Sequence, residues 1–212
     1  MAPTNREEYL SANCNTEEKW FYMRAYYGNG KKISEILNDK GIRNFFPVQV
    51  KKIYNNNRLK FEYSYPLPSN IFIRCTEYQA WKLVTSSHTP ESIDHLAFAY
   101  DHTHNHTDGK NPLMTIPDGM MQQFIQAASI EHNGVYYISD EELHKAEASQ
   151  ASQELKLKFG DTVRVTDGPF ADIVGKVLKV YGKKRVVVSI PNIINFATAS
   201  INLDYLQPVE DL

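Results

Sequence analysis

Residues 163–177 read VRVTDGPFADIVGKV, and this stretch decides the fold of the C-terminal part of the chain. Alternating apolar residues on both sides of a Gly-Pro pair predict two strands joined by a tight turn. Gly168 can take the positive φ that such a turn requires, and Pro169 fixes the φ of the next position. Gly175 allows a strand to bend where a side chain would collide. We therefore expect a small β-barrel.

The rest of the C-terminal part is also rich in strand-forming residues. The stretches that predict its strands are 162–166, 175–181, 185–190, 196–201 and a short piece near Leu206. Earlier in the chain, residues 139–142 read SDEE, a capping box that predicts the start of a short polar helix. Residues 146–153 have nothing to bury. We expect a linker at 131–154 and the barrel at 155–212.

The N-terminal part combines strand and helix patterns. Residues 1–18 are polar and without periodicity, so we expect a mobile arm there. Strands are predicted at 19–27, 42–50, 58–65, 70–75, 95–100 and 113–116, and helices at 31–40, 76–84 and from Pro117 onwards. This order is typical of an α+β fold: an open α/β sandwich with an antiparallel sheet, followed here by an SH3-like β-barrel.

Composition limits the class of protein. The 212 residues carry a formal net charge of -2, so any contact with nucleic acid has to be local. The two cysteines, Cys14 and Cys75, are too few for a disulfide framework and fit a reducing cytoplasm. No apolar run approaches the roughly 18 residues that span a bilayer, and the first residues lack a signal-peptide pattern. We expect a soluble cytoplasmic protein that does not contact membranes.

The spacing V-x-V-x-x-G-P-F-A-x-x-x-G-x-V resembles the KOW motif. The sequence DGPFAD at residues 167–172 resembles that of the NusG family of transcription elongation factors. The positions that carry the motif are Val165, Gly168, Pro169, Phe170 and Gly175. An unrelated SH3-like barrel is the alternative. The resemblance implies a KOW domain that recruits a second partner, either a ribosomal protein or a termination factor.

The N-terminal part is similar to the NGN domain that precedes KOW in this family. The matching features are Trp20 and Tyr22, a Gly-rich break, Lys31 to Leu37, Pro47, and the stretch at 65–73. The resemblance therefore implies an NGN domain at 19–130.

In that family the NGN domain seats an apolar pocket on the clamp coiled coil of the largest RNA polymerase subunit. The positions that match this pocket are Trp20, Tyr26, Leu67, Pro68 and Phe72. Trp20 and Phe72 also suit an ordinary core, whereas Leu67, in a loop beside a proline, is the better surface anchor.

Two positions depart from the family pattern: Ser69 and Asn70 replace its Gly-Tyr, and Gly30 stands where an acidic residue is usual. These changes resemble the specialised RfaH and UpxY paralogues, which act on long polysaccharide operons. A general housekeeping factor is the alternative. The resemblance implies that a factor of either kind, specialised or general, suppresses pausing or termination of transcription. We expect the protein to be a monomer.

Two groups of cations are candidates for contacts with nucleic acid. Arg24, Lys31 and Lys32 could meet phosphates of upstream or non-template DNA weakly, although a solvated helix face explains Lys31 as well. In the barrel, the cations of one hairpin suit an RNA or ribosomal-protein contact, or a charged turn that protects an edge strand. They are Lys179, Lys183, Lys184 and Arg185.

A metal-dependent enzyme is the remaining alternative. His102, His104 and His106 alternate between Asp101 and Asp108, as ligands on one face of a strand would. The run lacks apolar residues that would fix its geometry, so we expect no functional metal site. No nucleophile elbow or phosphate-binding loop is present either, and we expect a protein without a cofactor that is not an enzyme.

Overall fold

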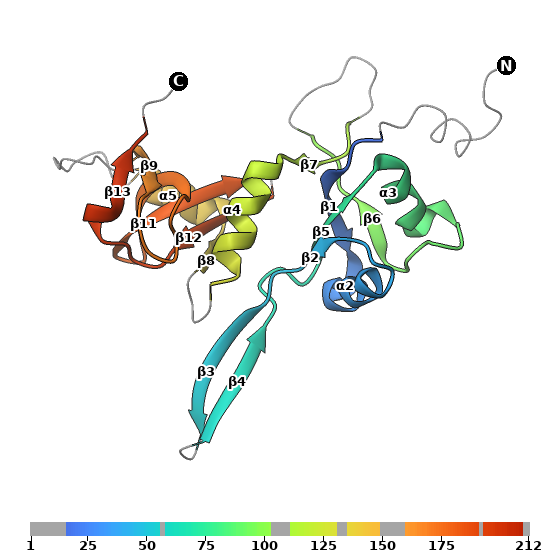
Figure 1. The fold of residues 1–212 in the computed structure, drawn as a ribbon, viewed down its shortest axis with the longest axis horizontal. Coiled ribbons are helices and arrows are strands. Elements are labelled where there is room, and N and C mark those ends of the chain that lie inside the picture. The colour runs from blue at the N-terminus through green and yellow to red at the C-terminus, as the bar shows by residue number, and fades with distance from the viewer. Residues whose placement is uncertain are drawn as a thin grey trace. The chain divides into compact units, whose positions relative to one another are not determined.

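The structure is a computed structural model, and it describes residues 16–55, 58–102, 111–130, 135–148, 160–190 and 193–209. The chain forms two compact units, each built from two separate segments (Figure 1). The first unit contains residues 1–47 and 67–121, and the second contains residues 48–66 and 122–212. Both units have antiparallel sheets, and the second is rich in β-structure, in agreement with the expected α+β class.

The sheet of the first unit has the strand order β2-β5-β1-β6, with β7 also paired to β1. Its strands are β1 (Lys19–Ala25), β2 (Asn44–Phe45), β5 (Asn70–Cys75), β6 (Leu96–Phe98) and β7 (Thr115–Ile116). The central strand β1 is buried at four consecutive residues from Trp20 to Met23, so it is apolar on both faces, as its sequence predicts.

Two helices accompany this sheet, α2 (Gly30–Asp39) and α3 (Glu77–Leu83), and a further helix, α4 (Asp118–Ala128), begins in the first unit and continues in the second. Helix α2 buries Ile33 and Leu37 at the expected helical spacing. Helix α3 begins with a reciprocal capping box in which the backbone N–H of Gln79 donates to Thr76 Oγ1 at 3.2 Å. The division between the two units falls within α4.

Strands β3 (Gln49–Asn55) and β4 (Arg58–Ser64) pair as a two-stranded ribbon (Figure 1). The expected single strand at 42–50 is therefore wrong, because the structure divides it into β2 and the start of β3. Pro47 lies between the two, buried and without the backbone N–H that a continuous ladder would need.

The sheet of the second unit has the order β13-β9-β10-β11-β12-β8. Its strands are β8 (Val135–Ile138), β9 (Thr162–Val165), β10 (Val174–Val180), β11 (Lys183–Ile190), β12 (Ile194–Thr198) and β13 (Leu206–Pro208). The turn between β10 and β11 consists of Tyr181 and Gly182, both at positive φ, a combination typical of a type I′ hairpin.

The segment expected as a linker, 131–154, differs from that expectation where the structure describes it. Residues Val135–Ile138 form β8, which pairs with β12, and the expected short helix is α5 (Asp140–Ala148). The capping box is present, since the backbone N–H of Glu142 donates to Ser139 Oγ at 3.2 Å. Four consecutive apolar or aromatic residues favour a strand over a solvated linker.

Short 3-10 turns complete the fold at Tyr26–Gly28, Thr85–Ser87 and Leu203–Tyr205. Across the described ranges, every helix is too short or too polar to cross a bilayer.

Candidate interaction surfaces

Two of the five residues expected in the polymerase-binding pocket lie in the core of the first unit. Trp20 is 2% exposed and Phe72 is 0% exposed. Phe72 packs against the ring of Tyr22 at a centroid distance of 5.7 Å, and the Arg43 guanidinium lies 5.4 Å from the Trp20 ring centre. The expectation that these two side chains line a surface pocket is therefore wrong, because strand β1 and its neighbour β5 are covered on both faces.

The other three residues are accessible. Tyr26 is 53% exposed, Pro68 is exposed and Leu67 is half-buried. Backbone hydrogen bonds fix the loop that carries Leu67 and Pro68. The N–H of Ala25 donates to Ser69 O at 2.8 Å, and the N–H of Gly30 donates to Pro68 O at 3.0 Å. The loop is thus held beside the end of β1 and the start of α2; we call Tyr26, Leu67 and Pro68 the loop patch.

Gly30 explains how this loop comes so close to α2. A Cβ atom at this position would lie 2.7 Å from Pro68 O and 2.5 Å from Phe46 Cε2. An acidic side chain, which the resemblance leads one to expect here, has no room. The departure at Gly30 therefore has a local packing cause: only a residue without a side chain allows the two backbones to approach.

Tyr27 is an exposed aromatic residue that the sequence argument missed. It is 88% exposed, adopts φ +58°, and its ring meets the His95 ring edge-on at 5.3 Å. The ring of Tyr26 lies 6.4 Å from that of Tyr27. Tyr27 thus follows Tyr26, a member of the loop patch, in the same turn, and the Tyr-Tyr pair before the glycines is the sequence signal for two exposed aromatic residues.

The three cations expected to contact DNA are exposed but differ in their surroundings. Arg24 lies on β1 with its guanidinium carbon 5.8 Å from the Tyr22 ring centre. Lys31 forms an ion pair with Glu35 at 3.9 Å, one helical turn away. Lys32 lines a cavity. At Lys31 a phosphate would therefore compete with the carboxylate of Glu35.

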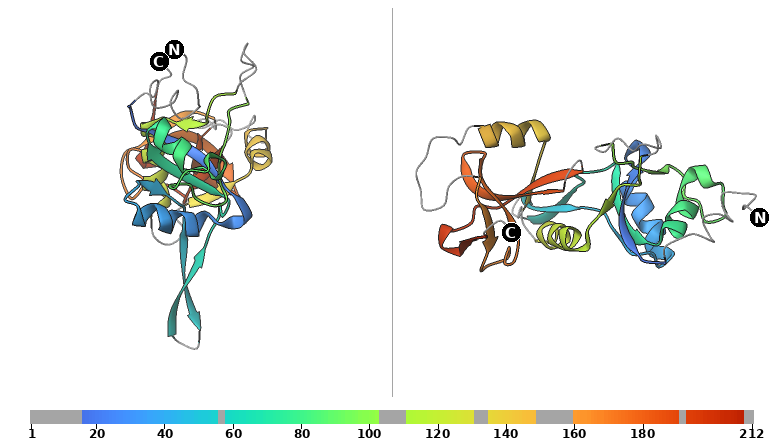
Figure 2. Two further views of the ribbon diagram at one scale, coloured as in Figure 1. Left: turned by 90° about the vertical axis from the view of Figure 1, so that its right-hand side faces the viewer. Right: turned by 90° about the horizontal axis from the view of Figure 1, so that it is seen from above.

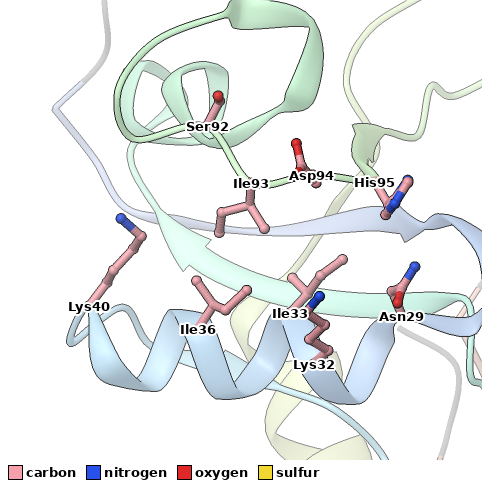
Figure 3. Close-up of a pocket in the computed structure, with 9 residues that line it drawn as sticks. All are labelled: Asn29, Lys32, Ile33, Ile36, Lys40, Ser92, Ile93, Asp94 and His95. Carbon is pink, nitrogen blue, oxygen red and sulfur yellow. The ribbon is translucent and has the colours of Figure 1, made fainter.

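That cavity has a volume of about 230 Å³ and lies between α2 and the segment 92–95 (Figure 3). Its floor is apolar, formed by Ile33, Ile36 and Ile93, with Lys32 and Lys40 at the rim. Pockets that bind drug-sized molecules usually measure about 300–1,000 Å³. The cavity is smaller than this, so it does not by itself indicate a substrate site.

The ribbon β3–β4 carries the largest exposed aromatic surface in the described part of the second unit. By the strand register, Tyr54 faces Leu59 and Tyr63 faces Val50, with Phe61 between them on the same side. Tyr54, Leu59, Phe61 and Tyr63 are 77%, 46%, 51% and 60% exposed. Lys52 lies opposite Phe61 in the register, so the residues of this face include a cation beside the exposed aromatic ones, and an exposed patch of this kind is typical of interaction surfaces. The sequence predicts the strand at 58–65, and the alternation of Leu59, Phe61 and Tyr63 places these three side chains on one face of it.

The turn of residues 163–177 has the geometry that its sequence predicts. Gly168 adopts φ +85°, and Phe170 and Val165 are buried at 6% and 0% exposure. Pro169 is exposed in the turn. A Cβ atom on Gly175 would lie 2.4 Å from Val187 O, so a side chain at this position would collide with β11. The five positions that carry the motif therefore have a structural role: they form the turn and allow two strands to approach closely.

The basic hairpin of the second unit contains three accessible cations and a buried one. Lys179 and Lys183 are exposed and Lys184 is half-buried. Arg185 is only 5% exposed: its Nη1 donates to Thr198 O at 2.7 Å and its guanidinium lies 4.0 Å from the Tyr136 ring centre. Including Arg185 in a surface patch was therefore wrong, because its charge is engaged inside the sheet.

The histidine run is only partly described. His104 and His106 lie outside the described residues, whereas His102 is exposed and its Nδ1 lies 2.6 Å from Asn111 Nδ2. Among the side chains that the structure places, no three His, Cys, Asp or Glu residues are close enough to hold a metal ion.

Comparison with known proteins identifies one motif. Residues 159–189 match the family model described as the KOW motif, which covers β9, β10 and most of β11. Comparison with curated proteins gave no match. Among solved structures, the chain is similar to one titled "Domain interaction in Thermotoga maritima NusG", with 14% sequence identity, a TM-score of 0.40, and coverage of 92% of this chain and 98% of that one.

Proposed function

We propose that this protein is a transcription factor of the NusG type that acts by binding and has no catalytic site. The observation that carries the proposal is the KOW motif at 159–189, present as a folded β-hairpin in the second unit. Further support comes from the first unit, where an antiparallel sheet with helices precedes the motif, in the order that an NGN domain and a KOW domain would have.

The proposed contact with RNA polymerase uses the loop patch. Its members Tyr26, Leu67 and Pro68 combine exposed apolar atoms with a backbone fixed by hydrogen bonds to Ala25 and Gly30. A rigid patch loses little conformational entropy when it docks on the clamp coiled coil of the largest polymerase subunit. Trp20 and Phe72 support the patch from the core by packing the strands that end beside it.

The proposed mechanism is a shift between open and closed states of the polymerase clamp. A factor that binds the closed state better by about 1.4 kcal/mol changes the ratio of the two states tenfold, which suppresses pausing or termination. Arg24, Lys31 and Lys32 would add weak contacts with phosphates of upstream or non-template DNA, since all three are exposed.

The second unit would fold as an SH3-like KOW barrel and recruit a ribosomal protein or a termination factor in the cytoplasm. We propose specialisation for polysaccharide-type operons, as in RfaH and UpxY proteins, on the basis of the departures at Gly30 and Ser69. A general housekeeping factor is the second candidate. Transcript mapping after gene deletion separates them, because a specialised factor alters few operons and a general one alters most.

The polymerase contact is tested by a pull-down of core RNA polymerase with the purified protein. Leu67→Asp places a charge in the loop patch and should abolish retention of polymerase. Leu59→Asp makes the same change on the ribbon, at a leucine that is 46% exposed, and should retain polymerase as well as the wild type does. The fluorescence of Trp20 and Trp81 reports the folding of the first unit, which contains Leu67, and far-UV circular dichroism reports the strands of both units, including the ribbon that contains Leu59.

Equal retention by wild type and Leu67→Asp would refute the loop patch as the contact. Loss of retention only in Leu59→Asp would move the contact to the ribbon, and would also refute the proposed patch.

A further inference from the structure

The sheet of the second unit is apolar on both faces. On the face that carries Phe196, the side chains of Val177 and Val186 are buried, with Phe124 of α4 packed on Phe196 at 5.3 Å. On the opposite face, Leu178, Val180, Val187 and Ala197 are also buried, at 1%, 5%, 3% and 0% exposure. Small barrels usually alternate buried and solvent-facing residues along each strand. This second apolar face, which we call the covered face, therefore requires a cover.

The cover is a single segment, residues 135–148, which consists of β8 and α5; we call it the strap. Helix α5 lies over the covered face (Figure 2), with Leu143 and Ala146 packed on its apolar side chains. Strand β8 pairs with β12, where Tyr136 lies opposite Ala197 and Tyr137 opposite Phe196. The Tyr136 ring also covers the guanidinium of Arg185.

The strap is held along one edge of the sheet by the pairing of β8 with β12 and by the packing of α5 on the covered face. Polar links between described residues also join it to the sheet: Asn195 Nδ2 donates to Asp140 at 2.7 Å, Tyr181 OH donates to Glu142 at 3.0 Å, and Lys176 pairs with Glu147 at 3.6 Å. The links of Tyr181 and Lys176 join exposed side chains and contribute little to stability, whereas Asn195 is buried. The strap also pairs with only one strand, at the end of the sheet. The strap should therefore open at a lower free energy than the strands it covers.

Strand β12 would be an edge strand without β8, yet all five of its residues are buried. An apolar edge of this kind readily accepts another strand. Strand β8 itself is the template for such a ligand: it is an extended segment that pairs with β12 and places the Tyr136 ring over the Arg185 guanidinium.

We propose that the strap occupies a docking site of the second unit, and that an extended segment of a partner protein displaces it by pairing with β12. The strap then acts as a built-in competitor that lowers the apparent affinity of the site for its partner. The inference concerns a site outside the loop patch, and it depends only on contacts within the second unit.

The test uses the full-length protein and a fluorescent peptide with the sequence of residues 135–139, VYYIS. Tyr137→Pro removes a backbone donor in the middle of β8 and should open the strap. Glu141→Pro is the matched control, because proline is tolerated in the first turn of α5. In fluorescence anisotropy, we expect Tyr137→Pro to bind the peptide at least tenfold more tightly than wild type or Glu141→Pro. A peptide with alanine in place of its first tyrosine should bind more weakly.

A tethered variant provides the opposite arm. The variant carries Cys14→Ser, Tyr137→Pro, Glu147→Cys and Lys176→Cys. A short bis-maleimide that joins the two new thiols would hold the strap on β10. We expect this cross-link to abolish binding of the peptide. Binding that persists with the tether in place would refute the proposal.

Hydrogen exchange distinguishes a removable strap from a structural one. In Tyr137→Pro, the amides of β12 should lose protection while those of β9, β10 and β11 keep it. Loss of protection throughout the sheet would overturn the proposal, because the strap would then belong to the cooperative core. Unchanged protection of β12, or peptide affinity equal to that of wild type, would overturn it as well.

Discussion

Replacing Gly175 by alanine should destabilise the second unit through one close backbone contact. The added Cβ would lie 2.4 Å from Val187 O and 2.9 Å from Val186 Cγ1. Ordinary contacts of a carbon atom begin near about 3.5 Å, so β10 and β11 would have to separate by about 1 Å. Overpacking should lower the free energy of unfolding by about 1–3 kcal/mol, and a weakened hydrogen bond should lower it by about 1 kcal/mol more. Alanine restricts the unfolded chain, which returns about 0.5–1 kcal/mol. We expect a net loss of about 2 kcal/mol.

The assay is urea unfolding followed by two probes. Both tryptophans, Trp20 and Trp81, belong to the first unit, so their fluorescence reports that unit, whereas far-UV circular dichroism reports the strands of both. Gly175→Ala should shift the dichroism transition to lower urea and leave the tryptophan transition unchanged. Gly119→Ala is the matched control, because its Cβ would meet nothing within 4 Å, and helix propensity predicts a gain of about 0.5–1 kcal/mol.

Two results would refute this reasoning. One is a Gly175→Ala protein whose transitions coincide with those of wild type. The other is full rescue by a second substitution, Val186→Ala. That rescue would show that the side-chain contact dominates, whereas we attribute the cost to the backbone oxygen of Val187.

Three further predictions follow from local environments. Burial raises the pKa of Cys75 to about 12, so in a Cys14→Ser variant the thiol should resist labelling at pH 8 until denaturant is added, and rapid native labelling would contradict this. Hydrogen bonds from Ser139 at the start of α5 and from the Tyr181 hydroxyl lower the pKa of Glu142. The ionised carboxylate therefore stabilises α5 fully at pH values above the usual glutamate pKa of about 4.3, and this stabilisation is lost as the pH falls through the lowered pKa. In Tyr181→Phe, carboxyl NMR titration should show the pKa of Glu142 moving upward; no movement would argue against the hydrogen bond. Gly30→Ala should cost about 1–3 kcal/mol in urea unfolding and weaken polymerase retention, and a variant with wild-type stability and retention would contradict the close loop contact.

Much of the fold follows from periodicity. The helix at 31–40 and the strands at 70–75 and 162–166 lie within one or two residues of α2, β5 and β9, because their apolar spacing matches the faces they bury. The turn around Gly168 was predictable for a second local reason, because few residues other than glycine readily adopt a positive φ.

The strap was missed because its strand signal is only four residues long and depends on a distant partner. Val135–Ile138 becomes a strand through pairing with β12, some sixty residues later in the chain. A polar helix and a run without apolar residues surround it, and these alone favour a linker. Tertiary contacts therefore decided the structure of this segment, which local propensity could not do.

The candidate site was predictable only in part. A resemblance names positions but does not say which side of a strand faces solvent. Trp20 and Phe72 lie on strands that are buried on both faces, so alternation gives no indication of exposure. Leu67 lies in a loop beside a proline, outside the strand ladder, so it is partly exposed. This exposure is what the sequence predicts for Leu67.

The path of the chain between the two units has a physical cause in two prolines. The first unit ends at Pro47 and resumes at Leu67, immediately after Pro66. The ladder of β2 and β5 ends where Phe45 pairs with Phe72, and neither proline, lacking a backbone donor, favours a continuous ladder through the connections to β3 and β4. Because the ribbon is excluded from that sheet, its apolar residues lack the covering layer that a longer sheet would provide. The two prolines thus favour the separation of the ribbon from that sheet, and the separation leaves the aromatic face of the ribbon exposed.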